Sequence, residues 1–307
     1  MLGAVRVSVN AFGMPITNEG VQKMSFLSTS YSRQAADEAK MDWPSRYGAP
    51  HSIDNWRHSR MLACTHPLTE ALPQSVWMTL GDGRYGSDAA YLKEQGVYAT
   101  ATSLTDEKLR VAHEQGFIDA YRIENAECIS LDDNAVDFVL CKEAYHHFPR
   151  PPIALYEMLR VARVGAVLIE PLDDIRVLSV VRTMAKKLLR GDIEMNFETS
   201  GNFLYRLNIR ELGKLHTAMG GKVMAFKGIN DFYHGRLSQC VANQWNAGTL
   251  LTKTGIAVQD ALARMRLMGF GLGCVVVFKG QPESKLLERL ARSGFKVIEL
   301  PKNPYAG

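Results

Sequence analysis

Two segments about 60 residues apart constrain the fold more than any other feature of the sequence. The first, SVWMTLGDGRYGSDA at residues 75–89, has the pattern of a buried strand, a glycine turn and the start of a helix. The second, AVDFVLCKEAYHHFPRP at residues 135–151, reads as a buried strand that ends in polar, ionisable and aromatic residues. In an open α/β sheet, both loops lie at the carboxyl ends of the strands, where such sheets bind ligands. The pair therefore predicts a nucleotide-type cofactor beside a reactive pocket.

The surrounding sequence extends this pattern into a sheet. Strands are expected at 76–80, 97–102, 120–123, 136–141 and 166–170, and helices at 87–95, 105–115 and 152–163. Strands that alternate with helices in this way indicate parallel βαβ units. The alternation resumes with strands at 222–226, 274–278 and 295–300 and helices at 255–268 and 283–293. The predicted fold class is α/β, with a Rossmann-like, mostly parallel sheet and helices on both faces.

Two regions fall outside the alternating pattern. Residues 1–74 are polar and broken by Gly and Pro, with a short strand at 5–9 and helices at 21–41 and 55–65, and we interpret them as an N-terminal helical cap on a core formed by residues 75–307. Residues 173–215 interrupt the core, and Asn208 and Glu211 suggest a capping box there. An insertion at this point is expected to cover the strand ends as a substrate lid, although a helical decoration that only packs is the alternative.

Composition narrows the class of protein. The 307 residues are 46% hydrophobic and 22% charged, as in an ordinary globular protein, and the formal net charge of +4 does not favour a nucleic-acid partner. Five cysteines without a C-x-x-C pair predict neither a disulfide framework nor a zinc or other metal site. The N-terminus lacks signal-peptide features, and the apolar runs are too short to cross a membrane. We expect a cytoplasmic protein, and the sequence leaves its oligomeric state open.

The glycine turn narrows the cofactor. Gly81, Gly83 and Gly86 have the spacing G-x-G-x-x-G, which lets the chain turn sharply and lets a ligand approach the N-terminus of the next helix. This spacing is compatible with NAD or with S-adenosylmethionine. An NAD site needs a carboxylate about 20 residues later, at the end of the second strand, to bind the ribose hydroxyls. Ser103 stands there instead, which weakens NAD and also removes a common ribose ligand of methyltransferases.

The region around the fourth expected strand favours S-adenosylmethionine. The successive pieces are NAE at 125–127, VD at 136–137, HHF at 146–148, LYEMLRV at 155–161 and VGA at 164–166. In this order and spacing they resemble class I S-adenosylmethionine-dependent methyltransferases of the small-molecule type. The resemblance covers residues 75–171, about a third of the chain. It implies a methyltransferase core that uses S-adenosylmethionine and acts on a small-molecule acceptor.

The resemblance also implies which residues hold the cofactor. These are Gly81, Asp82, Gly83, Gly86, Ser103, Asn125, Ala126, Glu127 and Lys142. The sequence departs from the family pattern in four places: the last glycine is displaced by one, Thr79 and Ser103 replace acids, and Asn125 replaces a common Asp. Ser103 and Asn125 can still bond a ribose hydroxyl and the adenine amino group, but more weakly than carboxylates.

Catalytic residues are expected beside the transferred methyl group. Methyl transfer mainly needs alignment of donor and acceptor, and an oxygen acceptor also benefits from a base that titrates near neutral pH. His147 is the favoured base, His146 the runner-up, and Glu143 a candidate to orient a histidine or bind substrate. A histidine that only hydrogen-bonds the loop is the alternative. Other residues expected near the substrate are Tyr145, Arg150, Phe197 and Phe203, with Tyr31, Trp43, Arg57, His58 and Arg60 as candidates in the cap.

These observations predict methyl transfer to an oxygen of a small molecule, such as a sugar or a secondary metabolite. Two alternatives remain. Ser103 and Asn125 would also suit a catalytically inactive, cofactor-binding scaffold or regulatory protein. The glycine spacing would suit an NAD(P)-dependent oxidoreductase, against which stand the missing acid and the absence of a Tyr-x-x-x-Lys pair.

Overall fold

A computed structural model describes residues 18–40, 47–173, 197, 203–243 and 245–305. The expected strand at 5–9, Trp43 and most of the expected lid lie outside the described residues. No helix within the described part of the chain is long and apolar enough to cross a bilayer.

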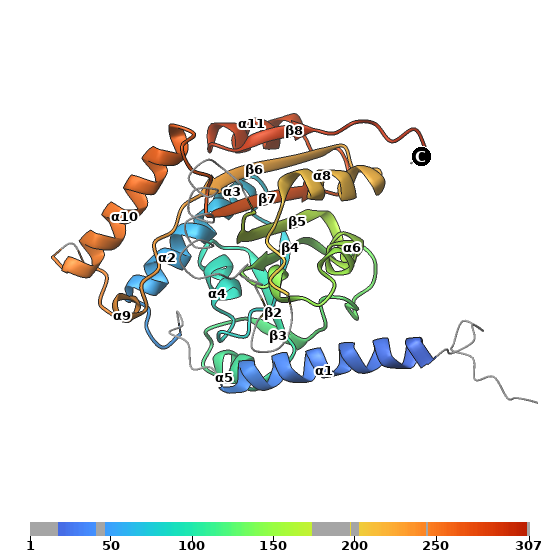
Figure 1. Ribbon diagram of the computed structural model, residues 1–307, viewed down its shortest axis with the longest axis horizontal. Helices are drawn as coiled ribbons and strands as arrows, with labels where there is room; N and C mark the ends of the chain where they lie inside the picture. Colours follow the sequence, from blue (N-terminus) through green and yellow to red (C-terminus); the bar gives the residue numbers. More distant parts are fainter. Residues whose placement is uncertain (1–17, 41–46, 174–196, 198–202, 244, 306–307) are drawn as a thin grey trace, which may run out of the picture.

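A sheet of eight strands forms the centre of the molecule, in the order β3-β2-β1-β4-β5-β7-β6-β8 (Figure 1). Neighbouring strands from β3 to β5 are parallel, whereas β7 runs antiparallel to both β5 and β6, and β8 runs antiparallel to β6. The predicted α/β fold class with a mostly parallel sheet is therefore confirmed. The strands are β1 (Val76–Leu80), β2 (Tyr98–Ser103), β3 (Ala120–Ile123), β4 (Val136–Lys142), β5 (Ala162–Pro171), β6 (Val223–Ile229), β7 (Leu272–Phe278) and β8 (Lys296–Glu299).

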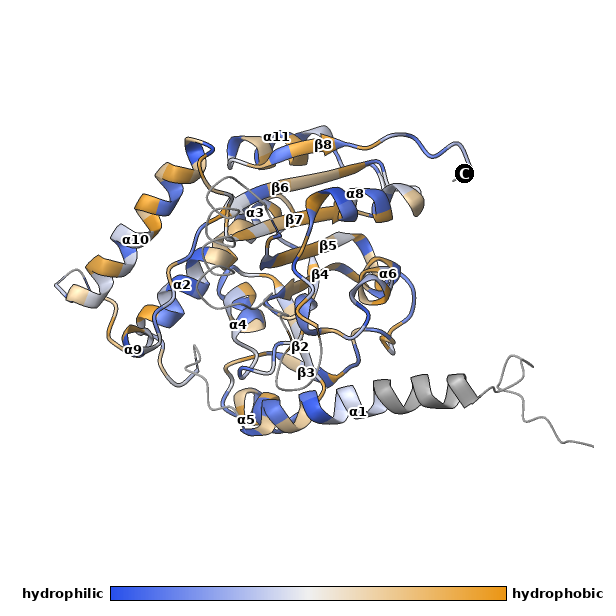
Figure 2. Cartoon of the chain, in the orientation of Figure 1, coloured by the Kyte–Doolittle hydropathy of each residue, from blue (hydrophilic) through white to orange (hydrophobic). Residues whose placement is uncertain are grey.

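Helices cover both faces of this sheet. On one face, Trp77 and Phe138 stack with ring centroids 4.5 Å apart and form a core with residues of α3 (His66–Ala71), α4 (Ser87–Glu94), α5 (Glu107–Glu114) and α11 (Ser284–Arg292). On the other face, Val139 and its neighbours pack against α6 (Pro151–Val161) and α8 (Ile209–Ala218). The central strands are accordingly hydrophobic (Figure 2). Burial on both faces explains their nearly continuous apolar sequences.

Two element boundaries differ from the sequence expectation for identifiable reasons. Strand β5 starts at Ala162, four residues early, because Ala162 already pairs with Val136 before an irregularity in the register. Helix α10 (Ala247–Arg264) starts eight residues early, because the side chain of Asn246 accepts a hydrogen bond from Gly248 N at 2.8 Å and caps the helix. Asn208 caps α8 in the same way, as the sequence predicted.

The N-terminal helices lie along the open edge and the ligand side of the core. Helix α1 (Asn18–Lys40) runs across the β2–β3 end of the sheet, with its last turns beside α5 (Figure 1). Helix α2 (Ile53–Leu62) is followed by a 3₁₀ turn and α3. Its start is joined to the segment after α9 (Gly235–Ser238), where Ile53 N donates to Cys240 O at 2.8 Å. Both helices thereby reach the carboxyl ends of the strands.

Candidate active site

A cavity of about 730 Å³ opens at the carboxyl ends of β1, β2 and β4. The core contributes residues that follow these strands, and the N-terminal region contributes residues of α1 and α2. Among the described lining residues, eight are Asp or Glu and four are Lys or Arg. The site therefore lies where open α/β sheets bind ligands, and its lining is predominantly acidic.

The three glycines of the turn have different structural roles. Gly81 and Gly86 have φ of +71° and +66°, which side chains of L residues rarely adopt. A Cβ atom on Gly81 would lie 2.5 Å from Ala144 Cβ, and one on Gly86 would lie 2.8 Å from Ile118 Cγ2, so both positions are fixed by packing. The atoms nearest to a Cβ on Gly83 would instead be those of the Glu38 side chain, which belongs to α1. Gly81 and Gly83 both line the cavity, whereas Gly86 does not.

Asp82 holds the turn together. Its buried carboxylate accepts hydrogen bonds from Ala89 N at 2.9 Å and Asp88 N at 3.1 Å, in the first turn of α4. Thr79, which stands where the family usually has an acid, donates to the same carboxylate at 2.9 Å. Burial and the neighbouring Asp88 raise the pKa of Asp82 to about 8. Asp82 therefore has a structural role in the turn, and its role at the cofactor stays a prediction.

Four of the five other predicted cofactor residues, Lys142 included, line the cavity, and one does not. Ser103, Asn125 and Ala126 lie along it. Asn125 Oδ1 accepts a bond from Glu127 N at 2.9 Å, which fixes the loop after β3. The Glu127 carboxylate points to Arg150 instead, accepting from its backbone N at 2.5 Å and from Nε at 2.7 Å. Glu127 and Arg150, predicted as cofactor and substrate residues, thus pair with each other.

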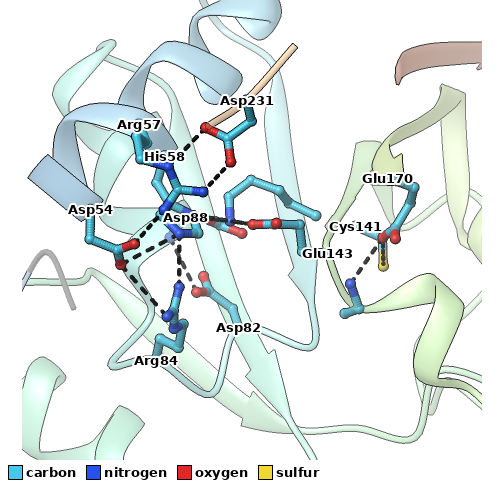
Figure 3. A network of polar contacts seen from close by, with 12 residues as sticks. Asp54, Arg57, His58, Asp82, Arg84, Asp88, Cys141, Glu143, Glu170 and Asp231 are labelled. Atoms are coloured by element: carbon cyan, nitrogen blue, oxygen red, sulfur yellow. Dashed lines mark hydrogen bonds and ion pairs between the residues drawn. The ribbon is translucent and has the colours of Figure 1, made fainter. Parts of the chain in front are cut away.

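A network of charged side chains from α2, the glycine turn and the end of β4 also lines the cavity (Figure 3). Lys142, at the end of β4, lies 2.9 Å from His58 Nδ1 and 3.4 Å from the Asp88 carboxylate. Burial alone would lower the pKa of Lys142, but the carboxylates of Asp88 and Glu143 outweigh it and raise the pKa. Burial lowers the pKa of His58 well below its usual value, and the cations Lys142 and Arg84 lower it further, so His58 is neutral.

Arg57 ties the cap to the core beside this network. Its guanidinium donates to Asp54 at 2.7 Å and, through Nε and Nη2, to both oxygens of Asp231, which follows β6 (Figure 3). The Arg57 and Asp54 side chains are each only 5% exposed. Arg60 donates to Asn230 O in the same loop. These two arginines, which the sequence suggested as ligand contacts, therefore make structural contacts between α2 and the loop after β6.

His146 is paired with a carboxylate that the sequence had not suggested. The 3₁₀ turn Tyr145–His147 follows β4, and His146 Nδ1 lies 2.5 Å from Oε2 of Glu170. Glu170 is fully buried near the end of β5, and its Oε1 accepts bonds from Ala144 N and Tyr145 N at 2.9 Å each. His146 and His147 both line the cavity, and a Gln34 side chain of α1 donates to His147 O at 2.5 Å.

The predicted substrate residues occupy different environments. Glu143, in the left-handed region with φ of 50°, lines the cavity and lies 3.3 Å from His58 Nδ1. Tyr145 is buried in the core, where it makes an edge contact with Phe148. Phe197 and Phe203 contact each other edge to face with centroids 5.7 Å apart, and each is more than half exposed. Tyr31 of the cap lies along the cavity, as expected.

Several acidic residues of the site went unnoticed in the sequence, and four of them are Glu38, Asp54, Glu170 and Asp231. Glu170 had a usable signal, because a lone acid near the end of an apolar strand at the ligand edge of a sheet is an unusual placement. The other three had none. They lie on polar helices or loops, and only the tertiary structure brings them to the cavity.

Comparison with known proteins agrees with the geometry. Residues 78–169 match the family model of a methyltransferase domain. Residues 78–169 therefore form a methyltransferase domain, and its cofactor is S-adenosylmethionine, as the sequence predicted. No curated protein sequence matches the chain significantly.

Similar solved structures include three of low sequence identity. One is an S-adenosylmethionine-dependent methyltransferase from Methanosarcina mazei (16% identity, TM-score 0.44, covering 68% of this chain and 94% of that one). Another is the YcgJ protein of Bacillus subtilis (17% identity, TM-score 0.46, covering 73% of this chain and 100% of that one). A third is magnesium protoporphyrin IX methyltransferase from Synechocystis PCC 6803 with bound S-adenosylhomocysteine (12% identity, TM-score 0.45, covering 85% of this chain and 99% of that one).

Proposed function

We propose that this enzyme methylates a hydroxyl oxygen of a small molecule, with His146 as the general base. When bound, S-adenosylmethionine supplies an electrophilic methyl group on a positively charged sulfur. The residues present suit it: Gly81 and Gly83 line the cavity without side chains of their own, and the acidic lining attracts a cation. The acceptor oxygen must lose its proton as the methyl group arrives, so a base beside it accelerates the reaction.

The pairing of His146 with Glu170 is the observation that carries this proposal. Oε1 of Glu170 accepts hydrogen bonds from two backbone N–H groups, and a carboxylate can only accept hydrogen bonds. The proton of the imidazole is then on Nδ1, 2.5 Å from Glu170 Oε2, and Nε2 is the basic nitrogen. A carboxylate that fixes the tautomer and stabilises the imidazolium is the arrangement that makes histidine an effective base.

The dimensions of the cavity support a small acceptor. Its volume of about 730 Å³ has to accommodate both the cofactor and the acceptor, which is the range of small-molecule sites. A sugar or a secondary metabolite with a free hydroxyl fits this limit. Cys64, Cys141 and Cys274 are buried and form no disulfide, which is in keeping with a cytoplasmic location.

The 173–215 lid remains part of the proposal. Its described end lies next to the catalytic turn, because Tyr205 N donates to His146 O at 3.1 Å and Leu207 N donates to Pro171 O at 2.8 Å. Contacts between this segment and the substrate would therefore directly affect the position of the loop that carries the base.

Replacement of each histidine separately tests the assignment of the base. His146→Ala should lower kcat by roughly 10²- to 10⁴-fold, the usual contribution of general acid–base catalysis. The Kd for S-adenosylhomocysteine should change little, because the base faces the acceptor. The measurement is single-turnover methyl transfer to a panel of hydroxylated and aminated small molecules, with binding of S-adenosylhomocysteine measured in parallel.

His147→Ala is the matched control for this experiment, since the two histidines are neighbours on the same turn. It should retain most of the activity. Loss of kcat in His147→Ala alone would move the base to His147 and leave the reaction class intact. Full activity of both variants on an oxygen acceptor would contradict a histidine base altogether.

A further inference from the structure

The end of strand β2 lacks the carboxylate expected to bind the cofactor ribose, and helix α1 places one at the same position. Ser103 ends β2, and its hydroxyl donates to Oε1 of Glu38 at 2.7 Å. We propose that Glu38, supplied by the N-terminal cap, binds the ribose hydroxyls of the cofactor in place of the missing acid of β2. This proposal rests on S-adenosylmethionine as the cofactor and is independent of the acceptor.

The contacts of Glu38 fix its carboxylate at this position. Thr105 Oγ1 donates to the same oxygen, Oε1, at 3.1 Å. Lys108 Nζ of α5 donates to the backbone O of Glu38 at 2.8 Å, which anchors the last turns of α1 on the core. Among the described contacts of Glu38, both side-chain bonds end on Oε1. Oε2 therefore keeps its lone pairs for a ligand in the cavity that Glu38 lines.

The location relative to the glycine turn points to the ribose. A Cβ on Gly83 would collide with the Glu38 carboxylate, so this carboxylate lies between the turn and the end of β2. In nucleotide sites of this type, the ribose lies between the glycine turn and an acid at the end of the second strand. A short serine at the strand end plus a carboxylate 2.7 Å beyond it reaches the same region as one long acidic side chain would.

Electrostatics supports the same role. Glu38 is half-buried, and burial raises the pKa of its carboxyl group in spite of the bonds from Ser103 and Thr105, which lower it. A partly desolvated carboxylate is stabilised when it accepts hydrogen bonds from further O–H donors. The two hydroxyls of a ribose supply such donors. The vicinal hydroxyls are thus the class of group that this site recognises.

The test compares two ligands on three proteins by calorimetry. The ligands are S-adenosylhomocysteine and its 2′,3′-dideoxyribose analogue, and the proteins are wild type, Glu38→Ala and Glu107→Gln. Wild type should prefer the ribose form by about 10- to 100-fold, the range for hydrogen bonds to a charged group. Glu38→Ala should lose most of this preference. Glu107→Gln removes a nearby negative charge from α5 and should keep the wild-type preference, which separates bonding from the general field.

Three outcomes would overturn the proposal. An unchanged preference for the ribose form in Glu38→Ala would show that Glu38 only attaches α1 to the core. Tighter binding of S-adenosylhomocysteine to Glu38→Ala would show that the carboxylate obstructs the cofactor. Absence of binding to the wild-type chain would instead reject the cofactor itself, and this result is distinguished by the wild-type titration alone.

Discussion

The core and the N-terminal cap both line the cavity, but they position their polar groups over very different distances along the chain. In the core, Asp82 bonds to backbone groups six and seven residues away. From the cap, Glu38 bonds to a residue 65 positions away, and Arg57 bonds to Asp231, 174 positions away. The contacts of the glycine turn are therefore encoded by a short motif, whereas those of the cap exist only once the tertiary structure has formed.

The largest expected effect in the cap concerns Arg57. Arg57→Met would remove the buried arginine that pairs with Asp54 and Asp231, which should cost about 3–5 kcal/mol of unfolding free energy. Arg289→Met is the matched control, because Arg289 pairs with Glu70 on the surface, where the two side chains are 45% and 61% exposed. That loss should stay below about 1 kcal/mol. Equal losses in urea unfolding would mean that the cap is not held by this ion pair.

A smaller expected effect is the pH dependence of the unfolding free energy that arises from His58 of the cap. Because the pKa of His58 is lowered in the folded protein, the unfolded chain binds a proton below about pH 6.5 that the folded chain does not. The stability contributed by neutral His58 is thus present above about pH 6.5 and is lost as the pH falls. The slope should be up to about 1.4 kcal/mol per pH unit. His58→Gln should lack this component when unfolding is followed between pH 7 and 5, and parallel curves for the two proteins would refute it.

Sequence patterns were sufficient for the core because its elements are locally determined. Strand β1 was predicted with its observed bounds, since an apolar run ends at a glycine that only a turn explains. The choice between His146 and His147 could not be made in the same way. Their roles depend on which ring the 3₁₀ turn directs at Glu170, and Glu170 is 24 residues further along the chain.

The cap was predicted as a region but not in its chemistry. Helix α1 was expected at nearly its observed position, yet nothing in its sequence distinguishes Glu38 from the other charged residues of the helix. Its role depends on a serine at the end of β2 that by itself indicated a weakened site. The departure from the family pattern and its compensation lie in different elements, so neither can be interpreted alone.

Binding of S-adenosylhomocysteine to the wild-type chain and to Gly83→Val tests the central claim most directly. Gly83 has no positive φ, and the atoms nearest to an added side chain belong to the Glu38 side chain and not to the backbone, so the variant should fold. The account predicts saturable binding of one ligand per wild-type chain and no binding to folded Gly83→Val. Absence of binding to the wild type at millimolar ligand would contradict it. Unchanged affinity in folded Gly83→Val would contradict it equally.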